Sequence, residues 1–287
     1  MIPTASTRTV DWRIGPFLVR AIFCAQVPGQ WEALYPTANI SHERRECGDF
    51  HVRLFIAPTP EWAADPAIIR QFPKSQLTRG KEGIHFSHAR FRGTVEKQRH
   101  AYEGRFEVAE NDLISLYLLL QTVVSWCCLE ENGVMLHTSG VVKDHRLYLF
   151  SGASGSGKTT IAAELSDGGT PFCVEAACLR KYHEGRWHAF PTPFSDFDGD
   201  VRLIASQEIH AIIFIEQASR HDASPLSPSQ CAFLTMKNAI FFFDDTALKR
   251  RLLEVASDIA ESTRAFALKF EKNSEFWRII MPMATSA

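Results

Sequence analysis

The chain has 287 residues, and its content of 45% hydrophobic and 22% charged residues is ordinary for a globular protein with a sizeable core. A formal net charge of -2 gives no electrostatic basis for binding nucleic acid or an anionic membrane surface, so we expect neither partner. The longest apolar run, residues 113–129, is too short and too polar to span a bilayer, and the first residues lack the apolar core of a signal peptide. We therefore expect a cytoplasmic protein of one large or two modest domains.

The cysteines show neither paired C-x-x-C spacing nor a histidine spacing suited to zinc. Several lie in apolar runs, where a cysteine behaves as a small buried hydrophobe. The adjacent Cys127 and Cys128 are expected to pack rather than to act as a redox pair, because neighbouring cysteines on a helix rarely reach disulfide geometry. The whole set, which fits a reducing compartment, is Cys24, Cys47, Cys127, Cys128, Cys173, Cys178 and Cys231.

The N-terminal third is predicted to be rich in strands. Residues 17–23, 50–56 and 84–91 alternate between apolar and polar side chains, and residues 100–108 are a fourth candidate. Such alternation is typical of an antiparallel sheet with one buried and one wet face. We interpret residues 1–110 as a β-rich accessory or substrate-recognition domain, whose sequence shows no motif for chemistry.

The N-terminal third also contains a group of histidines and a predicted short helix. His85 and His88 have odd spacing on one predicted strand and point to opposite faces, so with His100 they are not expected to form a metal site. Residues 61–72 are predicted to form a short helix with Pro66 in its first turn.

A long helix is predicted to open the second domain, residues 111–287. Asn111 is a suitable N-cap, the helix extends to about Glu131, and Gly133 supplies the stop. The segment has few charges, so we expect it to be buried on most sides. Its apolar stripe consists of Leu113, Leu116, Leu120, Val123, Val124 and Cys127.

A β-hairpin follows this helix. Residues 134–142 and 147–150 are apolar runs joined by the polar turn 143–145. His137 lies on the first of these strands, beside the strand that leads into a glycine-rich segment. A lone histidine on an apolar strand is usually structural, but this position also favours a functional role, and both interpretations remain open.

The glycine-rich segment fits the phosphate-loop pattern G-x-x-x-x-G-K-[ST], with a buried strand before it and a helix-forming stretch, 160–165, after it. Small residues let successive backbone N–H groups face an anionic phosphate, and the helix adds its positive N-terminus. Lys158 is expected to reach the β- and γ-phosphates, and Thr159 to hold Mg²⁺. We expect a nucleoside triphosphate to contact Gly152, Ser154, Gly155, Ser156, Gly157, Lys158, Thr159 and Thr160.

The sequence L-H-T-S-G-V-V at residues 136–142, followed by G-A-S-G-S-G-K-T-T at 152–160, resembles the C-terminal catalytic domain of HPr kinase/phosphorylase and the related ATP-dependent carboxykinases. It is similar also to a set of HPr kinase-like bacterial proteins that includes kinases of peptide natural-product pathways such as lasso peptides. Residues 185–194 and 211–217 extend this resemblance, which covers about 112–279. The loop alone is common to many NTPases, whereas its combination with the histidine strand is more specific.

The resemblance implies that the loop binds the phosphates of ATP with Mg²⁺ and that His137 lies near the γ-phosphate or the metal. It also implies a catalytic base and a metal contact from an acidic pair on the next strand, which here would span residues 171–180. This chain has Val174 and Glu175 at the expected pair. Valine can neither accept a proton nor bind Mg²⁺, so Glu175 alone would serve as base and metal ligand.

Three interpretations of this departure remain open. Glu175 has taken over both roles, or the chain binds ATP without transferring phosphate, or Glu175 is an ordinary surface charge on a strand. A one-residue shift along a strand reverses the direction of a side chain, which is why the position matters.

The remaining segments give weaker signals. Asp196, Asp198 and Asp200 lie in a loop that we interpret as a solvated turn rather than a Mg²⁺ or acceptor contact. Ser227 and Pro228 are predicted to begin a helix.

The core side of that helix is predicted to include Phe233 and Met236. Residues 241–243 are interpreted as core, with an acceptor-recognition surface as the alternative.

The C-terminal part is predicted to contain an amphipathic helix over 246–263, an edge strand over 265–270 and a short helix around 276–280. The basic residues 249–251 are taken as a solvated face, with phosphate binding as the alternative. The helix stripe expected to face the core is Leu248, Leu252, Val255 and Ile259.

Together these features predict an α/β (α+β, mixed-sheet) phosphate-loop domain of the HPr kinase/carboxykinase type behind a β-rich N-terminal domain. The predicted activity is Mg-ATP-dependent phosphoryl transfer to the hydroxyl of a peptide, protein or small-molecule alcohol, with Lys158, Glu175 and His137 as catalytic residues and Thr159 and Glu175 as metal ligands. The rival is a non-catalytic ATP-binding sensor or scaffold. A carboxykinase ranks last, because its additional carboxylate-binding and metal-binding residues are not found. Assembly into a homo-oligomer stays open.

Overall fold

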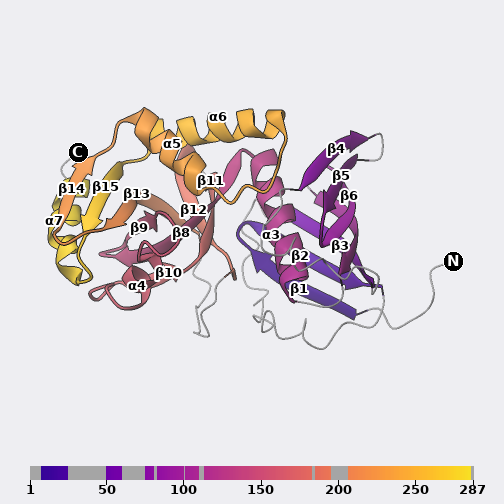
Figure 1. The fold of residues 1–287 in the computed structure, drawn as a ribbon, viewed down its shortest axis with the longest axis horizontal. Helices are drawn as coiled ribbons and strands as arrows, with labels where there is room; N and C mark the ends of the chain where they lie inside the picture. Colours follow the sequence, from indigo (N-terminus) through magenta and orange to yellow (C-terminus); the bar gives the residue numbers. More distant parts are fainter. Residues whose placement is uncertain are drawn as a thin grey trace. The chain divides into compact units, whose positions relative to one another are not determined.

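The computed structural model describes residues 8–24, 50–59, 75–80, 83–99, 101–109, 113–182, 185–194 and 206–285. The chain is a strand-rich mixed α/β protein that forms two compact units, each with its own mixed sheet (Figure 1). Unit 1 comprises Met1–Cys127 and Phe241–Leu248, and unit 2 comprises Cys128–Ile240 and Lys249–Ala287. The expected division between residues 110 and 111 stays a prediction.

Unit 1 is built on a seven-stranded sheet with the order β1-β2-β3-β7-β6-β5-β4. The sheet is mixed, because β3 pairs in parallel with both β2 and β7, so the prediction of an antiparallel sheet is wrong. Alternating burial depends only on which face packs against the core, and it carries no information on the direction of the neighbouring strand. The strands are β1 Arg8–Ile14, β2 Phe17–Phe23, β3 Phe50–Thr59, β4 Gln76–Gly80, β5 Gly83–His88, β6 Phe91–Lys97 and β7 Ala101–Ala109.

The expected strand over 84–91 is in fact two strands joined by a tight turn. The backbone N–H of Arg90 donates to Nδ1 of His88 at 3.1 Å, and the His88 ring stacks on Phe91. The chain reverses here, so Phe91 begins β6 rather than ending β5. The predicted helix over 61–72, His100 and Cys47 lie outside the described residues.

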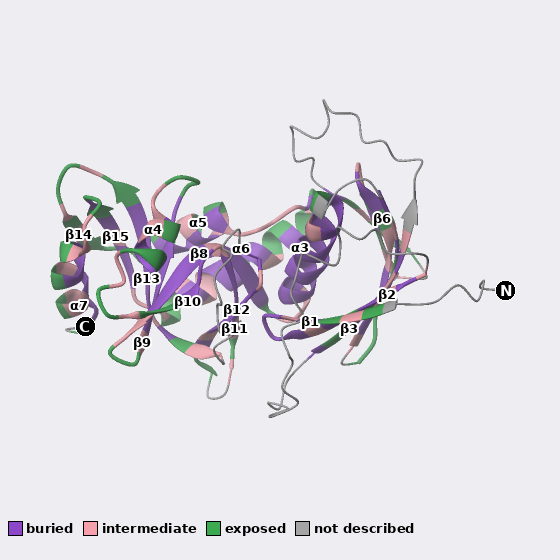
Figure 2. Cartoon of the chain, turned by 90° about the horizontal axis from the view of Figure 1, so that it is seen from below, coloured by how far each residue is buried: buried purple, intermediate pink, exposed green. Residues whose placement is uncertain are grey.

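Helix α3, Leu113–Glu130, is buried on most sides, as its lack of charge predicts. Figure 2 colours most of α3 purple, as buried. Within unit 1 the Trp126 ring meets Phe86 and Tyr102 edge-on, with centroids 5.6 and 5.4 Å apart. The predicted N-cap Asn111 lies outside the described residues. Cys127, Cys128, Cys173, Cys178 and Cys231 are buried free thiols, as expected of packing residues.

Unit 2 contains an eight-stranded sheet in which β9, β13 and β15 run parallel. Antiparallel strands flank this parallel centre. Its strands are β8 Gly133–Lys143, β9 Arg146–Ser151, β10 Thr170–Cys173, β11 Ala176–Lys181, β12 Trp187–Pro191, β13 Gln207–Gln217, β14 Asp222–Pro225 and β15 Ala265–Phe270. The helices that follow α3 are α4 Lys158–Ala163, α5 Pro228–Asn238, α6 Thr246–Ser262 and, after the 3₁₀ turn η2 Ser274–Phe276, α7 Trp277–Thr285.

The predicted hairpin is confirmed. Strands β8 and β9 pair antiparallel with Lys143 opposite Arg146, so Asp144 and His145 alone form the turn. Both have positive φ, 50° and 61°, which is the backbone that a two-residue turn needs to match the twist of its strands. The strand that carries His137 therefore lies beside the strand that leads into the glycine-rich loop.

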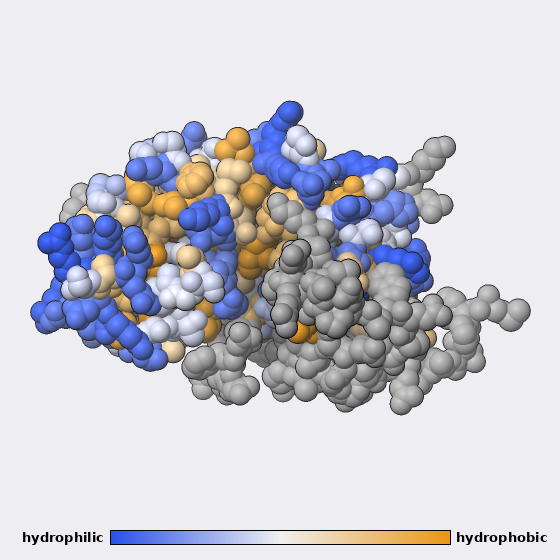
Figure 3. Space-filling model, in the orientation of Figure 1, coloured by the Kyte–Doolittle hydropathy of each residue, from blue (hydrophilic) through white to orange (hydrophobic). Residues whose placement is uncertain are grey.

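The strand predicted over 265–270 is confirmed, but its predicted place at the edge of the sheet is wrong. Strand β15 lies between β13 and β14, so it is internal to the sheet. Its neighbour β14 is a short exposed strand that ends in Pro225, and proline is typical of sheet edges. Hydrophilic side chains cover this end of unit 2, around β14 and α7 (Figure 3).

Helix α5 begins as predicted, since Ser227 and Gln230 form a reciprocal capping box ahead of Pro228. Phe233, however, is 65% exposed, so its predicted core position is wrong. The α5 core face is formed instead by Cys231, Ala232, Thr235 and Asn238. Helix α6 buries its predicted stripe, Leu248, Leu252, Val255 and Ile259.

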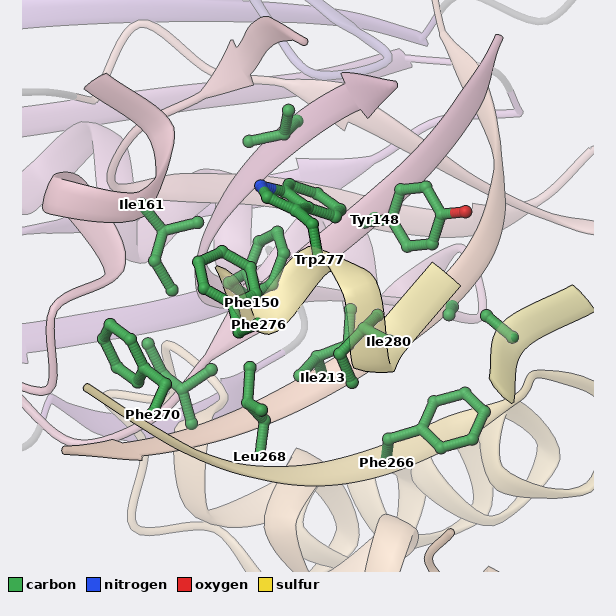
Figure 4. Close-up of a cluster of buried hydrophobic side chains, with 14 of the residues drawn as sticks. Tyr148, Phe150, Ile161, Ile213, Phe266, Leu268, Phe270, Phe276, Trp277 and Ile280 are labelled. Carbon is green, nitrogen blue, oxygen red and sulfur yellow. The ribbon is translucent and has the colours of Figure 1, made fainter. Parts of the chain in front are cut away.

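One apolar cluster packs α4 and α7 against the same face of the parallel strands, and we call it the α4–α7 core (Figure 4). Trp277 meets Phe150 edge-on at 5.4 Å, and its indole N–H donates to the carbonyl of Leu165 at 2.8 Å. The buried members are Val141, Tyr148, Phe150, Ile161, Ala162, Ala211, Ile213, Ile215, Phe266, Leu268, Phe270, Phe276, Trp277, Ile280 and Ala284. None of the helices in the described part of the chain combines the length and apolar character needed to cross a bilayer.

Replacing Trp277 with alanine should lower the free energy of unfolding by about 3–5 kcal/mol, because it opens a cavity in the α4–α7 core and removes the bond to Leu165. Urea denaturation at equilibrium measures this. Arg278→Ala is the matched control, since its side chain is 84% exposed, and it should change stability by less than about 0.5 kcal/mol. Equal effects of the two substitutions would contradict the role of Trp277.

Candidate functional site

The glycine-rich loop connects the end of β9 to the start of α4, at the edge of the sheet where the parallel strands end. Gly157 has φ 101°, and a Cβ there would lie 2.7 Å from Cζ of Phe270. A Cβ on Gly152 would lie 2.8 Å from the carbonyl oxygen of Ile215. Both positions therefore require glycine. Gly157 needs it for its positive φ and for the close approach of Phe270, whereas Gly152 needs it only for the close approach of the Ile215 carbonyl. The expected helix after the loop is confirmed but short, with six residues.

Lys158 occupies the first position of α4 and is only 5% exposed. Its Nζ donates to the carbonyl of Gly152 at 3.0 Å and to that of Ala153 at 2.9 Å. Burial lowers the pKa of Lys158, while the charge of Glu175 opposes that shift. An ammonium has three donors, so two hold the amine inside the loop and one remains for a ligand.

Neighbouring strands hold the loop by two further hydrogen bonds. The buried hydroxyl of Ser139, on β8, donates to the carbonyl of Lys158 at 2.7 Å. From the end of β13, the amide nitrogen of Gln217 donates to the carbonyl of Gly155 at 3.1 Å. The sequence did not identify either residue, because no rule relates the end of an apolar strand to a distant loop.

The strand predicted over 171–180 is broken, and the break creates the site. Val174 and Glu175 lie between β10 and β11, which pair with different halves of β8. Val174 is buried with 7% exposure, whereas the Glu175 side chain is 32% exposed. The backbone N–H of Thr138 donates to the carbonyl of Glu175 at 3.1 Å, which fixes Glu175 beside His137.

His137 and Glu175 are in direct contact. Nδ1 of His137 lies 3.0 Å from the carbonyl oxygen of Glu175 and 3.1 Å from its carboxylate Oε1. Burial lowers the pKa of His137, the ammonium of Lys158 lowers it further, and the Glu175 carbonyl opposes both. Because Nδ1 faces two acceptors, we assign its proton there, which leaves the lone pair on Nε2.

The structure brings together the three residues predicted to be catalytic: His137 contacts Glu175, and Lys158 is held through its carbonyl by Ser139, two residues from His137 on β8. They come from a strand, a strand break and the junction of the loop with α4. Glu175 is not an isolated strand charge, because its carboxylate contacts His137.

The remaining loop positions differ in exposure. Ser154, Gly155 and Thr159 are exposed, whereas Thr160 is half-buried. The Ser156 hydroxyl is buried and has no hydrogen-bond partner within the described residues.

Two other sequence-based candidates have different outcomes. Arg251 donates from Nε to the carbonyl of Leu129 at 2.6 Å and from its second nitrogen to that of Glu130 at 3.2 Å, so it caps the C-terminus of α3 rather than facing the loop. The aspartate loop at 196–200 lies outside the described residues. Among the residues that the structure describes, no cluster of three or more His, Cys, Asp or Glu side chains could hold a metal.

These features define unit 2 as a mixed α/β unit with a glycine-rich loop, a buried lysine and a histidine–glutamate pair at one edge of its sheet. The family model described as SynChlorMet cassette protein ScmC matches residues 106–283, and the chain belongs to this ScmC family. The matched residues include the loop, His137 and Glu175. The description of the family states no reaction.

A search of curated proteins finds no match. Among solved structures, the chain is similar to the Hpr(Ser) kinase/phosphatase from Coxiella burnetii, with 14% identity over 43% of this chain and 87% of that chain. The TM-score of 0.25 is too low to establish a shared fold.

Alanine at Gly157 should destabilise the protein more than alanine at Gly168. Both glycines have positive φ, 101° and 79°, but an added Cβ meets Phe270 at Gly157 and nothing within 4 Å at Gly168. We expect a loss of about 1 kcal/mol at Gly168 and about 2–3 kcal/mol at Gly157. Urea denaturation provides the comparison, and equal losses would show that Phe270 does not constrain the loop.

The stability of the protein should depend on His137 at acidic pH. Its pKa is lower in the folded chain than its ordinary value of 6.5, so its contribution is complete above about pH 6.5 and is lost as the pH falls through the folded pKa. His137→Gln should therefore lose less stability than the wild type between pH 7.5 and 5.

Free energies of unfolding at both pH values measure this difference. His51→Gln, at an exposed position of β3, is the control and should follow the wild type. Parallel losses in the wild type and His137→Gln would contradict a lowered pKa of His137 in the folded chain.

Proposed function

We propose that the chain is a Mg-ATP-dependent kinase that transfers the γ-phosphoryl group to a hydroxyl of a peptide, protein or small-molecule alcohol. The observation that carries the proposal is the contact between His137 and Glu175 at 3.1 Å beside the buried Lys158. A general base must approach the proton that it removes, and it must do so beside the transferred group. The contact of Glu175 with His137, on the strand whose Ser139 holds Lys158, supports a base in this position.

The loop supplies the phosphate-binding part of the proposal. Lys158 keeps one ammonium donor after its bonds to the carbonyls of Gly152 and Ala153, and that donor would bind a β- or γ-phosphate oxygen. Burying the Lys158 ammonium is costly, and an anionic ligand would offset that cost. The backbone of residues 152–160 would provide further N–H donors.

Magnesium fits the residues that are present. Thr159 is an exposed residue at the start of α4, and the Glu175 side chain is partly exposed. Mg²⁺ prefers oxygen ligands and commonly takes one or two from the protein, with phosphates and waters completing the shell. Bound there, the ion would neutralise charge that develops on the transferred phosphoryl group.

Glu175 would accept the proton of the acceptor hydroxyl. The hydroxyl oxygen would bond to the γ-phosphorus while the bond from that phosphorus to ADP breaks. His137, held by its Nδ1–H bond to Glu175, would orient that carboxylate and present Nε2 to the γ-phosphate side. The break between β10 and β11 makes this geometry available, because it points Glu175 toward the site while Val174 fills the core.

A second candidate function is an ATP-binding sensor or scaffold without transfer activity. The observation that favours it is Val174, which is buried where the resemblance to HPr kinase implies a carboxylate. A site with a single carboxylate has to use it both for the metal and for the proton. The experiment has to separate binding from transfer.

Two measurements test the proposal. Incubation with γ-labelled ATP, Mg²⁺ and candidate acceptors measures transfer, and calorimetry measures the binding of Mg-ATP. Lys158→Ala should abolish binding or turnover. Glu175→Gln should keep the Kd of Mg-ATP within about threefold and lower transfer by about 100-fold or more, which is the typical contribution of a positioned base. Asp258→Asn, at an exposed position of α6 that pairs with Lys181, is the control and should match the wild type.

The outcomes distinguish the candidates. Normal binding and turnover in Lys158→Ala would remove the loop as a phosphate site. ATP binding with neither transfer to any acceptor nor Glu175-dependent hydrolysis would favour the sensor. Transfer by Glu175→Gln at the rate of the wild type would show that Glu175 is not the base.

A further inference from the structure

Gln217 is the last residue of β13 and is exposed at the edge of the sheet from which the loop emerges. Its Nε2 donates to the carbonyl of Gly155 at 3.1 Å. The same atom lies 3.4 Å from the position that a Cβ on Gly157 would occupy. One amide group therefore reaches both the tip of the loop and the glycine that precedes Lys158.

The topology explains why this residue can reach the loop. Strand β13 runs parallel to β9, with Phe214 opposite Ser151, so both strands end at the same edge of the sheet. Ligands of such sheets bind in the crevice outside the carboxyl ends of the parallel strands. Gln217 extends from the neighbouring strand into that crevice beside the loop.

The hydrogen bond controls the direction of one peptide plane. A carbonyl and the following N–H point in opposite directions across a planar trans peptide. The Gly155 carbonyl points to Gln217, and the Ser156 N–H points to the carbonyl of Ala153 at 3.1 Å. Gly155 has φ 76° and nothing within 4 Å of an added Cβ, so its own packing does little to hold this plane.

We propose that Gln217 is a positioning residue that sets the tip of the loop in the conformation that receives the phosphates of the nucleotide. The inference rests on the proposed function and adds a residue to it. Gln217 touches the loop rather than any reacting group, so its effect acts on binding. Ordering a flexible loop on binding costs free energy, and a preorganised loop avoids most of this cost. Removal of the hydrogen bond from Gln217 should therefore weaken binding.

The test compares Gln217→Ala and Gln217→Glu with the control Glu216→Gln. Alanine removes the donor, and glutamate places an acceptor against the Gly155 carbonyl. Glu216 is the adjacent exposed residue, and strand alternation points its side chain to the opposite face of the sheet. The measurements are the Kd of Mg-ATP, the midpoint of thermal unfolding, and the exchange rate of the Ser156 amide without nucleotide.

Gln217→Ala should weaken Mg-ATP about three- to tenfold, the range expected for one lost hydrogen bond. Gln217→Glu should weaken it further, because its charge repels the phosphates. Both should accelerate exchange of the Ser156 amide while the unfolding midpoint stays within about 2 °C of the wild type. Glu216→Gln should match the wild type in all three measurements.

Several results would overturn the inference. An unchanged Kd in Gln217→Ala, with the wild type binding Mg-ATP, would reject the positioning role and leave the proposed function intact. A lower unfolding midpoint with unchanged Kd would show that Gln217 only braces the fold, and an equal change in Glu216→Gln would show a general effect of the strand end. Failure of the wild type to bind Mg-ATP would reject the proposed function and this role together, while the amide exchange would still show whether Gln217 holds the loop.

Discussion

The break between β10 and β11 is the constraint on which the site depends. An uninterrupted strand would place Val174 and Glu175 on opposite faces of one sheet, in register with a single stretch of β8. Instead the Glu175 carbonyl accepts from the Thr138 backbone, and its carboxylate meets the His137 ring at 3.1 Å. Burial and the nearby Lys158 ammonium lower the pKa of His137, which favours the neutral ring and a hydrogen bond from Nδ1 over a full ion pair.

The loop and this pair depend on the same strands. Strand β8 carries His137 and also Ser139, whose hydroxyl holds the first turn of α4. Strand β13 contributes Gln217 at the other side of the loop, and β15 contributes Phe270, which packs against Gly157. The α4–α7 core lies beneath these strands, so its packing also sets the position of Lys158. The geometry of the site is therefore a property of the whole parallel centre of the sheet.

Local patterns predicted much of this arrangement. The glycine and lysine spacing located the loop, the polar turn located the hairpin that carries His137, and the Ser227–Pro228 pair located the start of α5. Properties that depend on partners distant in sequence were not predictable. The parallel direction of β3, the internal place of β15 and the exposure of Phe233 are decided by which segments pair or pack. The strand break at Glu175 also depends on distant partners. The residues around it favour a continuous strand, and the break arises because β10 and β11 pair with different halves of β8.

The proposed function requires that the loop bind the phosphates of ATP with Lys158 facing them. A crystal structure with Mg²⁺ and a non-hydrolysable ATP analogue would test this. We expect a β- or γ-phosphate oxygen about 2.7–3.2 Å from Nζ of Lys158, with the terminal phosphate on the side of Glu175. An analogue bound away from residues 152–160, or a γ-phosphate directed away from His137 and Glu175, would contradict it.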